Sequence, residues 1–438
     1  MRLDSIHLTN YRCHADLTVN FAPGFNVVVG VNGSGKTSLL KGVCDSLAGL
    51  VVNMNAPQIQ PLSEPGHVRL LTLNSEGRFR FEPQYPVKIG AAGEAFDTAC
   101  VWTWTKTSQL NEVQLSGKWP GEIWQSIQQG NGPAAEARQA ATHLPLVAFY
   151  RANRHWNQPQ PNQMQAATQR NSRTDGYASW WDASLDSTAL QGWVIAKCLE
   201  RFQTSSETGV SFDAIENDEL ALVNTALAAA VEGVIGLRYD LKQKSLLIEW
   251  KADADARRDP TAFENLSDGQ RAVIGLVADI ARRMCLLNPQ LGTEVTVETA
   301  GVVLIDELDM HLHPQWQRIV TQGLKAAFPA LQFIVASHSP QVLGELPPEE
   351  IILLRPEGTS HPQVSYGMDS SRVLEEIMGA TARTPVIEDA LANLFASLER
   401  NELGSARDQL STLSATAPGL AELGGAEALL KRKELLGR

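Results

Sequence analysis

The chain has 438 residues, of which 43% are hydrophobic and 20% charged, a composition that is typical of globular proteins and excludes a disordered chain. It contains no run of about eighteen apolar residues and no apolar signal-peptide core at its N-terminus, so we expect a cytoplasmic protein with no membrane segment. The net charge of −12 gives no overall attraction to nucleic acid, and 5 scattered cysteines without a C-x-x-C pair argue against a disulfide framework and a zinc site.

The first predicted elements are two strands that precede a loop and a helix. Apolar and polar residues alternate over Arg2–Val19, which predicts two strands joined by the turn Asn10–His14. After the turn Ala22–Gly24, the apolar run Phe25–Val29 predicts a buried strand. This strand leads into a glycine-rich turn and then into a helix predicted over Thr37–Leu50.

The glycine-rich turn matches the pattern G-x-x-x-x-G-K-[ST], which starts at Gly30. Glycines in this pattern let backbone N–H groups close around a polyphosphate, while Lys36 supplies a positive charge and Thr37 a hydroxyl for Mg²⁺. The following helix directs its positive dipole end at the same anion. A glycine turn that binds no ligand is the alternative. We predict a polyphosphate and Mg²⁺ site with the loop residues Asn32, Gly33, Ser34, Gly35, Lys36, Thr37 and Ser38.

Three strands with several tryptophans come next. Segments 68–73, 78–81 and 99–105 have the residue types of strands separated by turns, and they predict an antiparallel lobe. Aromatic residues in strands belong to a core more often than to a base-stacking surface. Trp102, Trp104, Trp119 and Trp124 can therefore belong to the core or to a base-stacking surface, and the core is favoured.

The middle of the chain is predicted to hold a strand, a loop and a short helical insertion. The apolar run Leu144–Tyr150 predicts a buried strand. Gln158 and Gln160 follow it, in a loop whose register the neighbouring prolines leave open. Helical periodicity covers Asp186–Phe202 and Glu216–Ile235, and a hairpin is expected after it. No sustained heptad pattern occurs, so we expect no long coiled-coil arm.

A serine-led turn precedes the next predicted helix. The run Leu266–Gln270 places Ser267 at a helix start and Gly269 in a small turn, where exposed N–H groups form a second anion site. The apolar helix predicted over Ala272–Leu287 holds these groups in place. Read alone, the same run is also an ordinary helix N-cap.

The apolar run Gly301–Ile305 ends in two carboxylates. Asp306 and Glu307 follow it directly, as expected for a central parallel strand that delivers ligands at its C-terminal edge. We predict that Asp306 holds Mg²⁺ opposite Thr37. We also predict that Glu307 polarises a water molecule against the γ-phosphorus.

Three histidines lie close to the predicted strand ends. The apolar run Leu331–Ala336 predicts a buried strand, and His338 follows it. A capping or structural histidine is one interpretation of this residue. His311 and His313 suggest a metal site, which two imidazoles without a cysteine or a third histidine support only weakly.

The order of these motifs resembles the RecF, SMC and OLD-like group of ABC-type ATPases. The resemblance rests on the runs N-Y-R-C-H, G-V-N-G-S-G-K-T, L-S-D-G-Q and I-D-E-L-D-M-H-L-H-P. It implies that Arg12 contacts phosphate or ribose, with a surface arginine as the alternative. It also implies that Asp309 is the aspartate of the D-loop and that His338 contacts the γ-phosphate.

The resemblance implies an assembly as well as a fold. Such cassettes bind ATP between two subunits arranged head to tail, so Ser267, Gly269 and Gln270 of one copy would complete the site of its neighbour. The expected fold is an α/β P-loop NTPase of ABC type with a mixed central sheet, an antiparallel β-lobe and a helical lobe, plus a small C-terminal helical module.

The expected organisation has four segments. They are residues 1–150 for ATPase lobe I, residues 151–260 for a short helical insertion and a hairpin, residues 261–370 for ATPase lobe II, and residues 371–438 for a C-terminal helical docking module. Successive amphipathic helices from Ser371 onward predict the last of these. They form either a cap over the ATPase core or a docking surface for a partner.

The short insertion and the runs L-S-D-G-Q-R, L-I-D-E-L-D-M-H-L-H-P-Q-W-Q-R and L-E-E-I-M-G are similar to the ATPase subunits of Septu and retron-associated anti-phage defence systems. This resemblance implies a homodimer or higher oligomer that acts as an ATP-dependent sensor or scaffold. It would control a separately encoded HNH-type nuclease, with DNA or RNA, including retron nucleic acid, as a further candidate partner. The alternatives are a RecF-like DNA repair or recombination ATPase, and a nucleotide-gated binding scaffold with little turnover.

Overall fold

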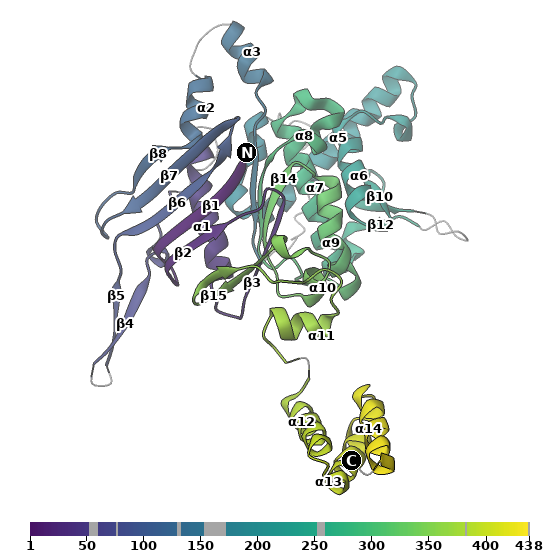
Figure 1. The fold of residues 1–438 in the computed structure, drawn as a ribbon. Coiled ribbons are helices and arrows are strands. Elements are labelled where there is room, and N and C mark those ends of the chain that lie inside the picture. The colour runs from purple at the N-terminus through teal and green to yellow at the C-terminus, as the bar shows by residue number, and fades with distance from the viewer. Residues whose placement is uncertain are drawn as a thin grey trace. The chain divides into compact units, whose positions relative to one another are not determined.

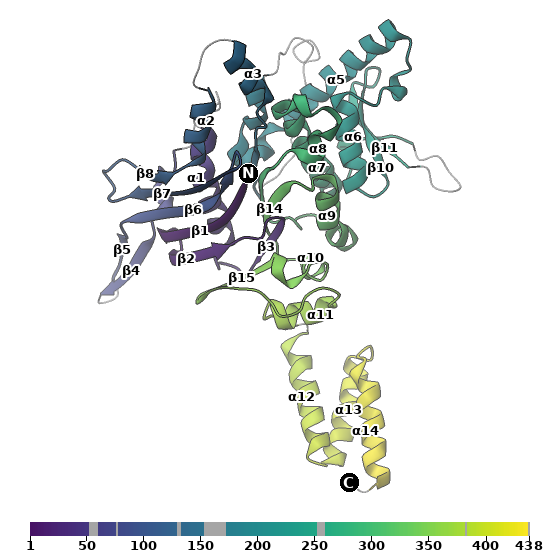
Figure 2. The same cartoon turned by 45° about the horizontal axis from the view of Figure 1, so that its top comes forward.

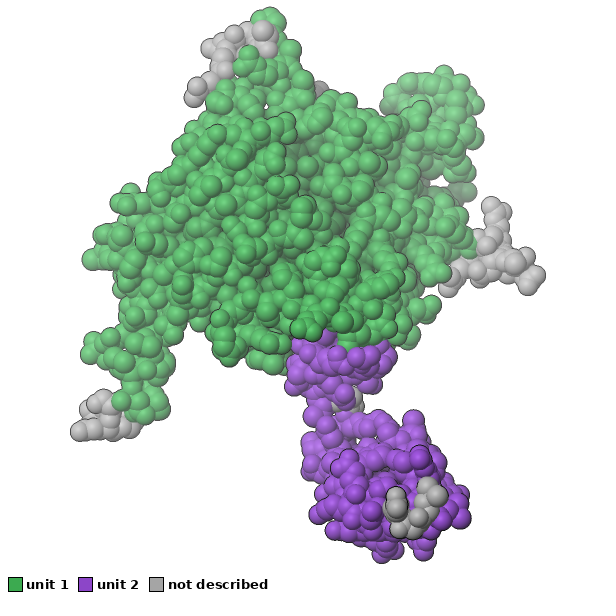
Figure 3. All heavy atoms as spheres, in the orientation of Figure 1, with its two compact units in different colours: residues 1–368 green, residues 369–438 purple. Residues whose placement is uncertain are grey.

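The computed structural model describes residues 1–51, 60–75, 78–128, 133–152, 172–251, 259–381 and 383–436. The chain forms two compact units, Met1–Met368 and Asp369–Arg438, coloured green and purple in Figure 3. The finer predicted boundaries at residues 150 and 260 remain predictions. All 5 cysteines are free, and none of the helices described is long and apolar enough to cross a membrane.

A six-stranded mixed sheet forms the centre of the first unit (Figure 1). Its outer strand pairs antiparallel with its neighbour, and the other neighbouring pairs are parallel. The inner strands are buried along their whole length and are apolar except for Asn26 and Gln332, because helices and sheets cover both faces. In sheet order the strands are β16 (Gly358–Ser360), β15 (Ile351–Arg355), β3 (Phe25–Val29), β14 (Leu331–Ala336), β13 (Gly301–Ile305) and β9 (Leu146–Tyr150).

An antiparallel five-stranded sheet contains the N-terminal strands and one of the three segments of the predicted lobe, residues 99–105. Trp102 and Trp104 on its third long strand are 2% and 9% exposed, and both indole N–H groups point to the carbonyl oxygen of Ser46 in helix α1 (Lys36–Leu47). These tryptophans are therefore core residues. The strands in sheet order are β2 (His14–Asn20), β1 (Arg2–Tyr11), β6 (Val87–Ala95), β7 (Thr98–Lys106) and β8 (Gln114–Lys118).

The predicted single lobe is divided between two sheets among the described residues. Strands β4 (Leu70–Ser75) and β5 (Arg78–Pro83) pair only with each other and project from the unit as a ribbon (Figures 1 and 2). Large apolar side chains on this ribbon remain exposed, as with Phe79 at 68%. Local strand patterns do not reveal which strands pair, so the sequence did not show this division.

Helices and a small sheet complete the first unit, with the insertion on the side away from the five-stranded sheet (Figures 1 and 2). The helix predicted to reach Ile235 ends at Ala230, because Gly233 adopts a φ of 79° and the chain turns into a strand. The remaining elements are α2 (Pro120–Gln128), α3 (Pro133–Ala141), α5 (Ser187–Thr208), α6 (Glu219–Ala230), β10 (Val234–Asp240), β11 (Ser245–Trp250), β12 (Thr261–Ala262), α7 (Asp268–Leu287), α8 (Val295–Glu298), α9 (Pro314–Ala327) and α10 (Pro340–Leu343).

The second unit is a set of helices with a core of its own. A short helix, α11 (Ser370–Arg372), and a π-helical turn over 373–377 come first. Three longer helices follow: α12 (Pro385–Glu399), α13 (Leu403–Thr416) and α14 (Glu422–Leu436). Their buried residues form one cluster of Leu391, Leu394, Leu398, Ala406, Leu413, Leu423, Ala426 and Leu430.

Candidate functional site

The loop between β3 and α1 curls around its own lysine. Gly33 and Gly35 have φ values of 81° and 98°, which L side chains rarely adopt, so glycine is needed at both positions. The Lys36 ammonium group donates to the carbonyl oxygens of Gly30 at 2.8 Å and Val31 at 3.1 Å. Burial lowers the pKa of Lys36, while the carboxylates of Asp306, Glu307 and Asp309 act in the opposite direction.

The loop has the features that a polyphosphate requires. The hydroxyl oxygen of Ser34 is buried and has no hydrogen-bond partner among the described residues. A Cβ on Gly30 would lie 2.5 Å from that oxygen, so this glycine leaves room for the close turn. A buried, unpartnered hydroxyl beside a charged lysine at a helix N-terminus fits an anionic ligand with several oxygens.

The predicted turn Asn10–His14 supports the loop from one side. A Cβ on Gly35 would lie 2.6 Å from the sulfur of Cys13, and His14 Nε2 lies 3.2 Å from the carbonyl oxygen of Gly35. Arg12 donates from Nε to the hydroxyl of Ser38 at 3.2 Å, so it lies at the first turn of α1. This position is compatible with the predicted phosphate or ribose contact, which remains a prediction.

The predicted magnesium ligands lie together although they are far apart in sequence. Thr37 donates its hydroxyl to the carboxylate of Asp306 at 3.3 Å. Asp306 is 4% exposed, and its backbone N–H donates to the carbonyl oxygen of Tyr150 on the neighbouring strand. Hydroxyl and carboxylate oxygens are the ligands that Mg²⁺ prefers. No cluster of three or more His, Cys, Asp or Glu side chains lies in the described part of the chain, so Mg²⁺ would need phosphate or water oxygens here as well.

Glu307, Asp309 and His338 lie on two adjoining loops. Glu307 has a φ of 50°, so the backbone bends sharply directly after Asp306. The carboxylate of Asp309 accepts the Ser337 hydroxyl at 2.7 Å and the backbone N–H of His338 at 3.1 Å. Asp309 therefore holds the backbone before His338 within the same chain, a contact that the motif did not predict.

The predicted signature residues begin helix α7 as a capping box. Ser267 accepts the backbone N–H of Gln270 at 3.3 Å, and the Gln270 side chain accepts the backbone N–H of Ser267 at 3.1 Å. The N-cap interpretation is therefore correct as local structure, and a role in anion binding remains a prediction. A Cβ on Gly269 would lie 2.4 Å from the carbonyl oxygen of His311, so this glycine lets α7 approach the loop after Glu307.

The two further histidines, His311 and His313, lie in the loop before α9 and at its N-cap. His313 accepts the backbone N–H of Gln315 at 3.4 Å and caps α9, while His311 has a φ of 64°. The candidate glutamines Gln158 and Gln160 lie outside the described residues.

Sequence patterns did not indicate a buried ionic group on α7. Asp279 accepts the Tyr150 hydroxyl at 2.8 Å, Arg282 Nη2 at 2.8 Å and Arg283 Nε at 2.7 Å. Burial alone would raise the pKa of Asp279, but Arg283 and Arg282 outweigh it and the pKa is lowered. The adjacent arginines Arg282 and Arg283 within the mostly apolar stretch 272–287 were the available signal, since buried arginines require partners.

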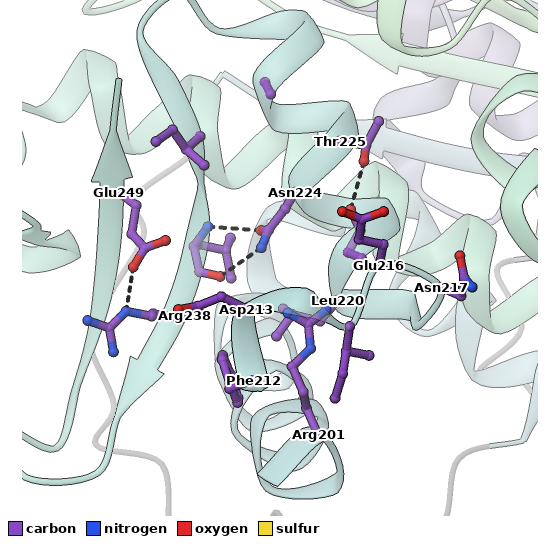
Figure 4. Close-up of a pocket in the computed structure, with 15 residues that line it drawn as sticks. Arg201, Phe212, Asp213, Glu216, Asn217, Leu220, Asn224, Thr225, Arg238 and Glu249 are labelled. Carbon is purple, nitrogen blue, oxygen red and sulfur yellow. Dashed lines mark hydrogen bonds and ion pairs between the residues drawn. The ribbon is translucent and has the colours of Figure 1, made fainter. Parts of the chain in front are cut away.

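A separate cavity of about 590 Å³ lies in the insertion, between α5, α6 and the β10–β11 hairpin (Figure 4). Some of its polar side chains are bound to one another or to the backbone. Asn224 bonds both the N–H and the carbonyl oxygen of Leu237, and Arg238 donates to Glu249 at 2.6 Å. This cavity contains none of the phosphate-loop residues.

Two family models, both described as AAA domains, match parts of the chain. Residues 5–207 match the family described as an AAA domain, and residues 248–344 match the family described as "AAA domain, putative AbiEii toxin, Type IV TA system". The first match contains the phosphate loop, and the second contains Ser267, Asp306, Glu307 and His338.

Similar curated proteins carry related names. The chain is 39% identical over 138 residues to the retron Vc95 probable ATPase of Vibrio cholerae, covering 29% of this chain and 26% of the relative. It is 33% identical over 204 residues to the retron Ec83 probable ATPase of Escherichia coli, covering 45% of this chain and 36% of the relative. It is 31% identical over 151 residues to the Septu protein PtuA of Bacillus thuringiensis, covering 32% and 38%.

The matched regions therefore span well under half the length of these relatives. Among solved structures, similarity extends to an SMC head bound to the C-winged helix domain of ScpA, with a TM-score of 0.45, 14% identity, and coverage of 82% of this chain and 97% of that one. By its sequence, the chain is similar to the probable ATPases of retrons and to the Septu protein PtuA, and two parts of it match AAA domains.

Proposed function

We propose that this protein binds and hydrolyses ATP at the edge of the central sheet, between the phosphate loop and the ends of β13 and β14. The observation that carries this proposal is the hydrogen bond of 3.3 Å between Thr37 and Asp306, which joins the loop to the strand end. Burial lowers the pKa of Lys36, and the carboxylates of Asp306, Glu307 and Asp309 partly oppose this shift.

Each residue has a defined task in this proposal. Lys36 and the loop N–H groups hold the phosphates, and Thr37 and Asp306 hold Mg²⁺, which neutralises phosphate charge when it is bound. Glu307 accepts a proton from the attacking water as general base. His338 donates to the γ-phosphate.

The variant Glu307→Gln tests the assignment of the base. We expect turnover to fall at least about a hundredfold, because a general base contributes about 10²–10⁴-fold, while Mg-ATP binding is retained. The matched control is Glu298→Gln, an exposed carboxylate on α8. Phosphate release and the binding of a fluorescent ATP analogue are measured for both variants, and unchanged turnover in Glu307→Gln would refute the assignment.

The proposed active unit is a head-to-tail homodimer or a higher oligomer. The start of α7 contains the predicted signature residues Ser267, Gly269 and Gln270. The side chain of Ser267 is exposed and that of Gln270 is half-exposed, so a second copy can reach them. In this arrangement the start of α7 in one copy contacts the ATP of the other. Glu307→Gln with Mg-ATP should then accumulate as a dimer in analytical ultracentrifugation.

The proposed biological role is regulation of an anti-phage defence complex. Support comes from the relatives that are named as retron ATPases and as Septu protein PtuA. In this role the protein is an ATP-dependent sensor or scaffold that controls a separately encoded HNH-type nuclease, with DNA or RNA as a trigger.

Purification from the native operon tests this role. We expect a small nuclease to co-purify, with its activity dependent on the nucleotide state of this chain. Absence of a nuclease, together with ATP hydrolysis stimulated by DNA ends, would instead favour a RecF-like function in repair.

A further inference from the structure

The loop that carries Glu307, defined here as residues 307–313, has a backbone that requires outside support. Glu307 and His311 have φ values of 50° and 64°, a region that non-glycine residues rarely adopt. Such conformations persist only where the surroundings fix them. The loop also lies against α7, because a Cβ on Gly269 would be 2.4 Å from the carbonyl oxygen of His311.

The side-chain amide of Gln317 on α9 bonds this loop on one side. Its Nε2 donates to the carbonyl oxygen of Asp309 at 3.3 Å and to that of Leu312 at 3.0 Å. Gln317 is half-buried, so water competes for these bonds less than at the surface.

The same amide bonds the loop of His338 on its other side. Its Oε1 accepts the hydroxyl of Ser339 at 2.7 Å. Ser339 directly follows His338 and also caps α10 by accepting the backbone N–H of Val342 at 3.2 Å. One amide thus uses its donor group on the Glu307 loop and its acceptor group on the His338 loop.

A second connection, through the side chain of Asp309, also joins the two loops. The Asp309 carboxylate accepts Ser337 and the His338 backbone N–H, as described above. The two connections lie before and after His338. Together they restrict the movement of His338 relative to Glu307.

We infer that Gln317 is a positioning residue that keeps Glu307 and His338 in register toward one γ-phosphate. This inference rests on the proposed ATP hydrolysis and adds a residue that no motif assigned to it. A merely structural interpretation of the same bonds is that Gln317 secures the start of α9, whose N-cap, His313, follows Leu312.

The variant Gln317→Met removes the amide and nearly preserves the volume of the side chain. We expect kcat to fall at least about tenfold, because small displacements of catalytic groups reduce rates strongly, while the Kd for Mg-ATP and the Tm stay close to those of wild type. The control variant is Gln315→Met, which changes an exposed glutamine on the same helix, and we expect it to have the kcat of wild type.

A double-mutant cycle separates positioning from helix stability. If Gln317 acts through Ser339, then Ser339→Ala lowers kcat and the double variant is no slower than Gln317→Met alone. Additive losses of kcat, or a loss that follows a lower Tm and weaker ATP binding, would overturn the inference. If Gln317→Met has the kcat of wild type, the inference about Gln317 is overturned and the proposed ATP hydrolysis is unaffected. If the wild-type protein shows no turnover, the proposed hydrolysis and this inference are both overturned.

Discussion

At the scale of single residues, Lys36 and Gly269 have contacts within the chain in addition to their predicted roles in ligand binding. Lys36 forms bonds to the loop carbonyls of Gly30 and Val31, and these would be exchanged for phosphate oxygens on binding. Gly269 was predicted as part of an anion site, yet its contact with the backbone of His311 requires glycine for close packing alone. A motif residue can therefore be fixed by packing as well as by ligand chemistry.

Two buried titratable residues, Asp45 and His67, lie next to Tyr11 of the turn Asn10–His14. Asp45 on α1 accepts the Tyr11 hydroxyl at 3.0 Å and lies 3.5 Å from His67. Burial raises the pKa of Asp45 to about 7 and lowers the pKa of His67 to about 4. Both groups are therefore neutral at slightly acidic pH.

The variant Asp45→Asn is predicted to change the pH dependence of stability. Because the folded pKa of Asp45 is raised, the folded state binds more protons than the unfolded state, and this carboxyl lowers stability as pH rises from about 4 to about 7. The asparagine variant lacks this loss. Its free energy of unfolding relative to wild type should therefore increase between pH 5 and pH 8 in urea titrations, and an equal difference at both pH values would contradict the raised pKa.

At the scale of elements, α7 is held to the central sheet by buried charge. Asp279 joins Tyr150 on β9 to Arg283 on α7, and Arg283 also donates to the carbonyl oxygens of Gly176 and Ala178. Because α7 begins at Ser267, this group fixes the helix that presents the predicted signature.

Asp279→Ala should destabilise the protein by about 3–5 kcal/mol, since it leaves two buried guanidinium groups without their carboxylate. The control is Arg80→Ala in the pair Arg80–Glu82, where the arginine side chain is 80% exposed and we expect a change below about 1 kcal/mol. Urea denaturation measures both variants. Similar stabilities for the two would show that the buried group contributes little.

At the scale of the whole molecule, the proposed dimer makes each ATP site depend on two copies of the chain. One copy would contribute Lys36 and the other Ser267. A two-fold symmetric dimer of this kind has two composite sites, so it predicts complementation between two inactive variants, because one composite site in each mixed dimer is intact.

Lys36→Ala and Ser267→Arg should each abolish turnover alone. When the two are mixed and allowed to exchange subunits, turnover should return to at most about one quarter of wild type, because half of the dimers are mixed and each has one of its two sites intact. Steady-state phosphate release measures the recovery. Persistent inactivity of a mixture shown to contain mixed dimers would exclude a composite site.

The sequence by itself determined the elements whose signals are local. The strand Phe25–Val29, the glycine loop, the cap at Ser267 and the strand Gly301–Ile305 followed from apolar runs, glycine conformations and capping residues within a few positions of each other. The order of these signals along the chain carried the resemblance that implied the P-loop fold class.

Only the tertiary structure decided the long-range contacts that no motif covers. The motifs predicted that Thr37 and Asp306 meet, and the sheet order of β3, β14 and β13 brings them together across 269 positions of sequence. The partners of Asp279 and the two loops joined by Gln317 depend on packing in the same way. Local patterns do not contain this information, because pairing and burial arise from the summed free energy of long-range contacts rather than from any one segment.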